Sequence, residues 1–394
     1  MTKYQILTLN QISSQGLHRF PAARYVVGKA VEHPDAILVR SHDMHQMTIP
    51  ASVKAIGRAG AGTNNIPVAE MSKRGVPVFN APGANANAVK ELVLAALLIA
   101  ARNVMPALGY VAGLRAAAAD LEARVEEGKK QFAGVELPNR TLGIVGLGAI
   151  GSLVADTAIK LGMKVVGFDP EITVDAAWRL SSSVRRAHGI EELLKQADFV
   201  TLHVPLLQVT RHLIDAKRLA AMKSGAVLLN FARDAIVEED AVVAALRAHK
   251  LKCYLCDFPS AKLIGEPGVV ALPHLGASTE EAEANCAVMV VDQVREFLEN
   301  GALSNAVNFP SVEMARESPY RVAIANANVP NMLGQISTTM AKAGLNIHNM
   351  LNKSRGEMAF TLVDVDSPIQ QKVIATLAAI DGVLSVRYIP ATES

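Results

Sequence analysis

A glycine-rich segment at Gly146–Gly151 has the composition of a phosphate-binding turn. Its residues read Gly-Leu-Gly-Ala-Ile-Gly, after the apolar run Thr141–Val145 and before a helical pattern over 152–161. The first glycine permits a tight turn, the second lets backbone N–H groups approach a pyrophosphate, and the third lets the helix pack against the strand. The helix N-terminus adds partial positive charge. This context predicts a dinucleotide site; a glycine-rich turn in a non-binding α/β domain is the alternative.

A second strand pattern, Lys164–Phe168, ends at Asp169, which lies 18 residues past the last glycine of the turn. A carboxylate at that point accepts a hydrogen bond from a ribose 2′-hydroxyl and repels a 2′-phosphate. We therefore expect the cofactor to be NAD rather than NADP. The expected cofactor-binding residues of this segment are Gly146, Gly148, Ala149, Ile150, Gly151 and Asp169.

Two later residues have the chemistry for proton transfer and for carboxylate binding. Arg233 ends the string Asn230-Phe-Ala-Arg, and His274 lies in Pro273-His-Leu-Gly-Ala-Ser-Thr. Histidine titrates nearest to neutral pH and can accept and return a proton. Arginine stays charged, and its planar fork fits a carboxylate and an adjacent developing oxyanion. Taken singly, a surface salt-bridge arginine and a packed loop histidine are the commoner explanations.

Together with His203-Val-Pro-Leu-Leu-Gln-Val-Thr210, these strings resemble the D-isomer-specific 2-hydroxyacid dehydrogenases, in family order, over residues 1–310. The resemblance implies that Arg233 holds the substrate carboxylate and polarises the reacting oxygen, and that His274 exchanges the hydroxyl proton. It also implies that Asp257 lies near the nicotinamide carboxamide. The further cofactor-binding residues that it implies are His203, Val204, Pro205, Thr210, Ala232, Asp257, Gly276 and Ala277.

Two positions depart from the family pattern. Asp234 follows the arginine where glycine is usual, and Ala261 stands where the family has the glutamate that orients its histidine. Losing that carboxylate removes a partner that raises the imidazole pKa and holds the ring. Glu266 is the candidate catalytic residue that takes its place if its loop folds back.

The segment 56–65 resembles the substrate loop of the phosphoglycerate dehydrogenase branch of this family. Its glycines at 57, 60 and 62 are expected to let backbone N–H groups meet a carboxylate. Arg58 is the natural phosphate ligand, because a guanidinium binds phosphate bidentately, and Arg40 matches another cationic position of the branch. The alternative is that both are ordinary solvated arginines. The expected substrate residues are Arg40, Ser41, Arg58, Ala59, Gly60, Ala61 and Gly62.

The C-terminal segment 320–390 has the pattern strand–helix–strand–strand–helix–strand and resembles an ACT regulatory domain. In the phosphoglycerate dehydrogenases such domains pair between subunits, and some bind serine at the interface. Asn328 and Asn346 match the polar positions that hold that effector, and Asn326 replaces a histidine of the pattern. L-Serine is therefore a hypothetical effector, with Asn326, Asn328 and Asn346 as its expected site; a turn-capping role for Asn346 is equally open.

The elements that must position these residues form two strand–helix series before this segment. The alternation predicts an α/β fold of two Rossmann-like parallel-sheet domains plus a C-terminal α+β domain of ACT type. We expect a discontinuous substrate-binding domain at 1–100 and 285–310, with an NAD-binding domain at 101–284 inserted in it. The ACT-type domain is expected at 318–394.

Composition limits the partners. A formal net charge of +2 and 4% aromatic residues argue against nucleic acid and anionic membranes. The longest apolar stretch has ten residues, half of the roughly 20 that a membrane helix needs. Three cysteines fit a reducing compartment, so we expect a cytoplasmic protein. The spacing Cys253-x-x-Cys256 indicates a buried strand rather than a metal site, and His42 and His45 indicate a surface loop, so no metal is expected.

These observations predict NAD-dependent oxidation of D-3-phosphoglycerate to 3-phosphohydroxypyruvate, the first step of L-serine biosynthesis, by a homodimer or homotetramer. One alternative is another 2-hydroxyacid dehydrogenase, acting on hydroxypyruvate, glyoxylate or 2-oxoglutarate. A second is a catalytically silent NAD sensor or corepressor on the same fold, which the missing glutamate at 261 favours and the retained Arg233 and His274 oppose.

Overall fold

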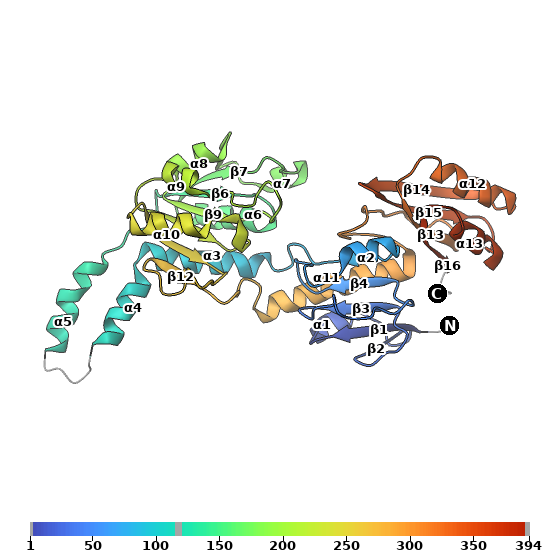
Figure 1. The fold of residues 1–394 in the computed structure, drawn as a ribbon, viewed down its shortest axis with the longest axis horizontal. Helices are drawn as coiled ribbons and strands as arrows, with labels where there is room; N and C mark the ends of the chain where they lie inside the picture. The colour runs from blue at the N-terminus through green and yellow to red at the C-terminus, as the bar shows by residue number, and fades with distance from the viewer. Residues whose placement is uncertain (1–2, 115–119, 391–394) are drawn as a thin grey trace. The chain divides into compact units, whose positions relative to one another are not determined.

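The computed structural model of the chain describes residues 3–114 and 120–390. It divides into two compact units. Unit 1 comprises Met1–Asn85 with Glu280–Ser394, and unit 2 comprises Ala86–Thr279. Figure 1 shows the elements of both units in chain order, from blue to red.

The first sheet of unit 1 has five parallel strands in the order β2-β1-β3-β4-β5. One face packs against α1 and α11 and the other against α2, which bury two separate apolar clusters. Gly57 lies inside β4, where an added Cβ would come within 3 Å of the Val290 and Val294 side chains of α11. This glycine therefore serves helix–sheet packing. The elements are β1 (Tyr4–Leu9), α1 (Ser14–Leu17), β2 (Tyr25–Gly28), β3 (Ala36–Val39), β4 (Ala55–Arg58), α2 (Val68–Lys73), β5 (Val78–Phe79) and α11 (Glu280–Asn300).

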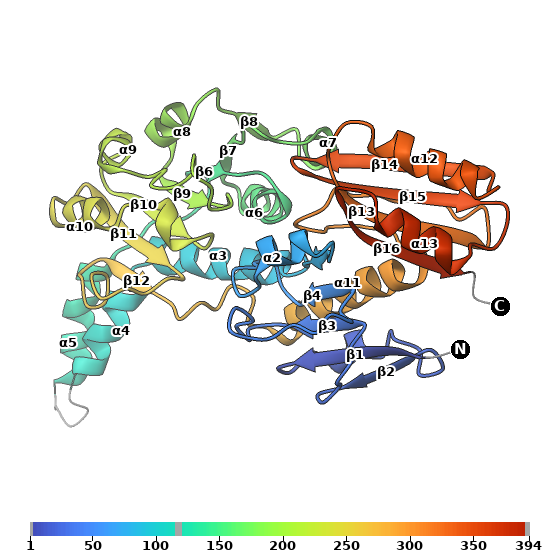
Figure 2. The ribbon, with the colours of Figure 1, turned by 45° about the vertical axis from the view of Figure 1, so that its right-hand side comes forward.

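The second sheet of unit 1 has four antiparallel strands in the order β14-β15-β13-β16. Helices α12 and α13 cover one face (Figure 2). The other face packs into the same cluster as α11, through residues such as Phe360 and Ile389. The expected element order is confirmed, and the sheet fits an ACT-like domain. The elements are β13 (Tyr320–Ala327), α12 (Met332–Lys342), β14 (Ile347–Arg355), β15 (Met358–Val365), α13 (Gln371–Ala378) and β16 (Val383–Pro390).

Unit 2 is a seven-stranded parallel sheet in the order β12-β11-β10-β9-β6-β7-β8. Helices α3 and α6 cover one face and α8, α9 and α10 the other. The sheet elements are β6 (Thr141–Val145), β7 (Lys164–Phe168), β8 (Val184–Arg186), β9 (Phe199–Leu202), β10 (Ala226–Asn230), β11 (Leu251–Cys256) and β12 (Val269–Ala271). The helices are α3 (Ala86–Ala101), α4 (Val104–Gly113), α5 (Leu121–Gly128), η1 (Lys129–Phe132), α6 (Ala149–Lys160), α7 (Val174–Arg179), α8 (Ile190–Gln196), α9 (Ala216–Ala221), η2 (Asp234–Ile236) and α10 (Glu239–Arg247).

The expected Rossmann-like architecture of both parallel sheets is thus confirmed, and Cys253 and Cys256 lie in β11 as expected. The division of the chain differs from the expected domain boundaries near 100 and 285. Helix α3 belongs to unit 2 because its buried residues, such as Val93 and Leu97, pack with Leu142 of β6. Helix α11 belongs to unit 1 from its first residue, and the ACT-like sheet shares that unit.

Helices α4 and α5 form a pair that projects from the rest of unit 2 (Figure 1). Among the described residues, no single helix is long and apolar enough to cross a membrane. Within residues 3–114 and 120–390, one pair, α3 and α4, reaches the required length and composition when taken together, but the two helices are bent by 64° at the break between them.

Candidate active site

The predicted site residues of unit 2 follow the carboxyl ends of six parallel strands of one sheet. The glycine turn follows β6, Asp169 follows β7 and His203 follows β9. The segments of Arg233, Asp257 and His274 follow β10, β11 and β12 in the same way. Carboxyl ends of parallel strands share one edge, and the strand order reverses between β9 and β6, where open α/β sheets bind ligands.

The glycine turn has the geometry that a pyrophosphate cradle requires. Gly146 has φ 93°, and an added Cβ would lie 2.5 Å from the carbonyl oxygen of His203. Gly151 packs against the turn itself, since its Cβ would lie 2.0 Å from the Gly146 carbonyl oxygen. At Gly148, by contrast, an added Cβ would meet no described atom within 4 Å apart from its neighbours. Space is therefore open where the N-terminus of α6 begins, which fits NAD phosphates.

Asp169 is held beside this turn. One carboxylate oxygen accepts from the Leu147 amide at 2.8 Å and the other from the Glu171 amide at 3.0 Å. A carboxylate has about four acceptor sites, so two remain for ribose hydroxyls. The residue types and the open cradle together fit the nucleotide half of NAD.

His203 and Thr210 shape the loop after β9. The ring Nε2 of His203 lies 3.0 Å from the Thr201 hydroxyl, and its buried Nδ1 has no hydrogen-bond partner among the described residues. Burial lowers the pKa of His203 to about 3, so the ring is neutral at physiological pH. The Thr210 hydroxyl donates to the Pro205 carbonyl and accepts from the Leu207 amide. Thr210 thus builds the loop, while Leu207 and Val209 present exposed apolar side chains.

Arg233 is exposed at the end of β10, and Asn230 sets its backbone. The fully buried Asn230 amide donates to the Arg233 carbonyl at 2.8 Å and accepts from the Ala232 amide at 3.2 Å. Arg233 uses one Nη1 donor on the Ala232 carbonyl at 2.6 Å. In the sequence, Asn230 stands out only as an uncharged polar residue that ends an otherwise apolar strand, which does not predict this role.

Asp257 anchors the histidine loop. Its buried carboxylate accepts from the Leu275 and Gly276 amides, both at 2.7 Å. Burial raises the pKa of the Asp257 carboxyl, and the two amide donors act in the opposite direction. His274 has φ 59°, a left-handed conformation that is uncommon for residues other than glycine. Its exposed ring packs edge-on against Phe258, with centroids 5.1 Å apart.

The structure does not pair Glu266 with this histidine. Both of its carboxylate oxygens accept from the Arg247 guanidinium, at 2.9 and 2.7 Å. The prediction that Glu266 replaces the acid missing at Ala261 is therefore wrong, because the loop after β11 directs Glu266 towards Arg247 at the end of α10. The carboxylate that feels His274 is that of Asp257: the charge of the ring and the His274 backbone amide both act to lower the pKa of Asp257. No hydrogen bond from the ring to a carboxylate is found among the described residues.

The predicted substrate residues of unit 1 lie at and just after the carboxyl ends of β3 and β4, which are neighbouring strands. Arg58 Nε donates to the Arg40 carbonyl at 3.0 Å, and its guanidinium lies directly over Gly60, where a Cβ would be 1.7 Å from Nη1. Arg40 forms an ion pair with Glu283 of α11, with Nη2 and Oε1 2.5 Å apart.

Three asparagines that sequence reasoning missed hold these substrate loops. Asn10 accepts from the amides of Ser41 and His42, Asn65 donates to the carbonyls of Arg40 and His42, and Asn80 donates to the Ala61 carbonyl. These contacts join segments 19 to 32 residues apart, so spacing carries no signal for them.

The expected effector asparagines do not meet within one chain. Asn326 is buried and donates to the Ala327 carbonyl. The Asn328 side chain donates to the Gly356 carbonyl, beside the start of β15. Asn346 precedes β14, and its backbone N–H donates to the Asp366 carboxylate, beyond the end of β15. Asn328 and Asn346 therefore lie at opposite ends of the four-stranded sheet.

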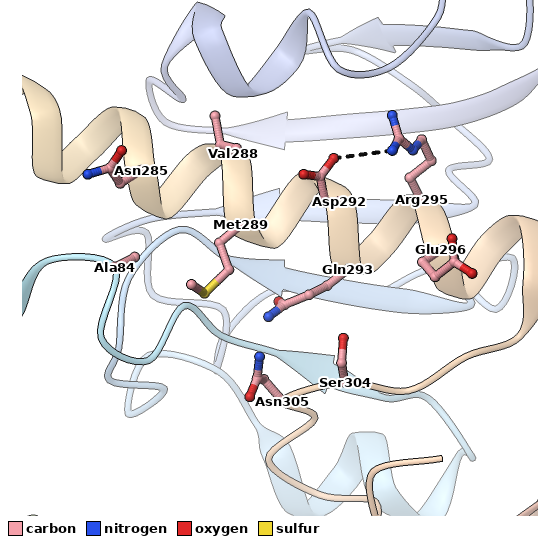
Figure 3. Close-up of a pocket in the computed structure, with 10 residues that line it drawn as sticks. All are labelled: Ala84, Asn285, Val288, Met289, Asp292, Gln293, Arg295, Glu296, Ser304 and Asn305. Carbon is pink, nitrogen blue, oxygen red and sulfur yellow. Dashed lines mark ion pairs between the residues drawn. The ribbon is translucent and has the colours of Figure 1, made fainter. Parts of the chain in front are cut away.

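A groove of about 720 Å³ lies along α11 in unit 1 (Figure 3). Asp292 and Arg295 form an ion pair on its wall, at 3.4 Å. Gln293 points towards Asn305 (Figure 3) and has neither amide atom paired among the described residues. None of the lining residues is among the predicted site residues, so we do not assign the groove to catalysis.

Comparison with known proteins agrees with this site. The profile of the D-isomer specific 2-hydroxyacid dehydrogenase, NAD binding domain, matches residues 104–276. D-3-phosphoglycerate dehydrogenase of Haemophilus influenzae is 32% identical over 350 residues, covering 85% of this chain and 81% of that protein. The enzyme of the same name from Methanocaldococcus jannaschii is 33% identical over 347 residues, and that of Synechocystis is 36% identical over 301. The match covers 85% and 73% of this chain, but only 62% and 51% of these two relatives' lengths.

Among solved structures, the cofactor (NAD+)-bound 3-phosphoglycerate dehydrogenase of Entamoeba histolytica is 25% identical, with a TM-score of 0.61 over 78% of this chain and 99% of that one. The TT0316 protein of Thermus thermophilus is 29% identical, with a TM-score of 0.62 over 77% and 99%. The chain therefore belongs to the D-isomer-specific 2-hydroxyacid dehydrogenase family, and its second unit is the NAD-binding domain of that family.

Proposed function

We propose that this chain oxidises D-3-phosphoglycerate to 3-phosphohydroxypyruvate with NAD+, the first step of L-serine biosynthesis. The observation that carries the proposal is the placement of Arg40 and Arg58 at neighbouring strand ends, joined by a hydrogen bond from one to the backbone of the other. Two guanidiniums at one loop pair suit a phosphate, which unphosphorylated 2-hydroxy acids lack. The relatives named for this activity add support.

In this reaction, His274 takes the proton of the C2 hydroxyl, and the Arg233 guanidinium binds the carboxylate and the developing C2 oxygen. Arg40 and Arg58 hold the phosphate. Bound NAD+ supplies the hydride acceptor. Asp257 and Asn230 contribute by fixing the backbones of the histidine and arginine loops.

The test is NADH oxidation by the intact enzyme on phosphohydroxypyruvate, hydroxypyruvate, glyoxylate and 2-oxoglutarate, with NADPH in parallel. We expect kcat/KM to be highest for phosphohydroxypyruvate with NADH. A higher value for an unphosphorylated acid would replace the proposed substrate, and a preference for NADPH would contradict the role of Asp169.

A silent NAD sensor is the second candidate, favoured by the engagement of Glu266 with Arg247 and by Ala261. Absence of turnover on every 2-oxo acid, together with tight NADH binding by fluorescence titration, would favour the sensor over the enzyme.

We further propose that the chain acts as a homo-oligomer, a dimer or tetramer, in the cytoplasm. Within the described residues, α4 buries none of its ten residues, and Met105, Leu108 and Val111 are 43, 58 and 56% exposed. Such an apolar helix suits a second copy. All three cysteines are free thiols, which supports a reducing compartment. Sedimentation of the wild type and of Leu108→Glu tests the assembly.

L-Serine remains the proposed effector. Because Asn328 and Asn346 lie at opposite ends of one sheet, the site needs a second copy to complete it. The test is to titrate the intact enzyme with L-serine and, as a control, with D-serine. We expect L-serine to inhibit turnover and D-serine to have no effect.

A further inference from the structure

Helix α11 brings a carboxylate to the proposed phosphate site. Glu283 lies in its first turn, 243 residues after Arg40 in the chain, and the two form an ion pair at 2.5 Å. The Arg40 side chain is 35% exposed and that of Glu283 is 41% exposed. An ion pair this accessible is weak and readily exchanged.

Arg58 is a second guanidinium beside this pair. Arg58 donates to the Arg40 carbonyl, which keeps the two arginines together. Cys286, one turn further along α11, is buried beside them, and its thiol feels the charges of Arg58, Arg40 and Glu283. Glu283 is therefore one carboxylate placed next to two guanidiniums.

A carboxylate at this position opposes a phosphorylated substrate. It occupies an Arg40 donor that a phosphate oxygen would use, and it repels the phosphate at short range. For a phosphate oxygen to take the Nη2 donor of Arg40, it has to displace Glu283 from that nitrogen. An unphosphorylated substrate brings no anion to Arg40, so it meets no such competition.

We propose that Glu283 is a specificity-determining residue, an internal counter-anion that Arg40 exchanges for the substrate phosphate. It weakens binding of phosphorylated substrates while leaving the chemical step and the binding of unphosphorylated ones unchanged. The inference rests on the proposed function in one respect, the assignment of Arg40 and Arg58 to the phosphate.

The test compares Glu283→Gln with the matched control Glu281→Gln, an exposed residue in the same helical turn that loses the same charge. Glutamine keeps a hydrogen-bond acceptor for Arg40 but no charge. We expect Glu283→Gln to lower the KM for phosphohydroxypyruvate about three- to tenfold, with kcat and the KM for hydroxypyruvate within about twofold of wild type. Glu281→Gln should behave as wild type.

A second measurement does not need turnover. Inorganic sulfate should stabilise the holoenzyme against heat, and the half-maximal concentration should fall about three- to tenfold in Glu283→Gln. Adding Arg40→Met should abolish that difference. Equal sulfate midpoints in wild type and Glu283→Gln would overturn the inference, as would equal KM values for phosphohydroxypyruvate.

The two failures are distinguishable. One possible result is that wild type does not reduce phosphohydroxypyruvate, while the sulfate midpoint is lower in Glu283→Gln than in wild type. The proposed substrate is then wrong, and the counter-anion role of Glu283 stands. If wild type reduces phosphohydroxypyruvate and neither measurement responds, the counter-anion alone fails. A change in kcat with unchanged KM would also contradict it, because that result places Glu283 in the chemical step.

Discussion

The two ends of α11 use arginine in opposite ways. At the first turn, Glu283 holds the accessible guanidinium of Arg40 in a single ion pair. At the last turn, three arginines from the C-terminal part of the chain donate to the helix's final carbonyl groups, at 297 to 300. These arginines are Arg387, Arg316 and Arg321.

The difference lies in how many donors remain. Arg321 is fully buried and uses all five N–H groups: two bind the Asp364 carboxylate and three bind backbone carbonyls. It has no donor left for a ligand, and it supplies partners for carbonyls that a helix end leaves unpaired. Arg40 retains donors and solvent access. Burial and donor count, rather than residue type, separate structural arginines from those that can bind substrate.

The strongest way to break this comparison is Arg321→Met. The change leaves the buried Asp364 carboxylate without its cation, so we expect a loss of about 3–5 kcal/mol in the free energy of unfolding. Chemical denaturation measures it. Adding Asp364→Leu removes the unpaired charge and should recover part of the lost stability. The recovery should be incomplete, because the three backbone carbonyls that Arg321 paired remain without a partner. A single variant as stable as wild type would show that the helix end does not depend on this residue.

Arg40→Met should give the opposite pattern. We expect the KM for phosphohydroxypyruvate to rise about 10- to 100-fold through lost charged hydrogen bonds, with unfolding free energy within about 0.5 kcal/mol of wild type. Steady-state kinetics and denaturation of the same preparation report both quantities. A large stability loss with little change in KM would place Arg40 among the structural arginines.

Arg387→Met tests the intermediate case. Its guanidinium stacks 4.4 Å from the Phe297 ring centroid and donates to two carbonyls, and burial lowers its pKa to about 10. We expect a loss of about 2 kcal/mol in unfolding free energy, with KM unchanged. Arg387→Lys is the control that keeps the charge but removes the planar guanidinium. If Arg387→Lys is as stable as wild type, the stability lost in Arg387→Met comes from the charge rather than from stacking on Phe297.

The smallest effect is expected for Glu266→Gln. The pair with Arg247 is exposed on the arginine side, so its loss should shift the thermal midpoint by less than about 2 °C. Because Glu266 is engaged by Arg247, kcat should stay within about twofold of wild type. A drop of tenfold or more, with a shifted pH profile, would restore Glu266 as the partner of His274.

Local patterns predicted the nucleotide-binding unit well. The turn at 146–151, the strands on either side of its helix and Asp169 follow from glycine geometry and apolar runs over short spans of chain. The alternation of strands and helices in this unit was also predicted, but the place of helix α3 in it was not. Its membership of unit 2 could not be predicted, because that depends on which sheet its apolar face meets.

Contacts between distant segments were not predictable. Nothing in the spacing couples Glu283 to Arg40, or Arg321 to the end of α11. Glu266 was offered to His274 by proximity in the sequence, yet the turn after β11 directs it to Arg247. Charged side chains reach several partners, and only the folded backbone decides between them.

The apolar cluster that joins both sheets of unit 1 contains Ile6 and Ile389, nearly the whole chain apart. During synthesis, unit 2 is a continuous segment and can fold once its last strand has left the ribosome. Unit 1 cannot fold at that stage, because the apolar core of its first 85 residues is completed by α11 and the C-terminal sheet, which are synthesised later. Unit 1 begins first in the sequence, but it is therefore the second to fold. The inserted unit 2 folds first, and unit 1, whose two segments flank it in the sequence, folds last.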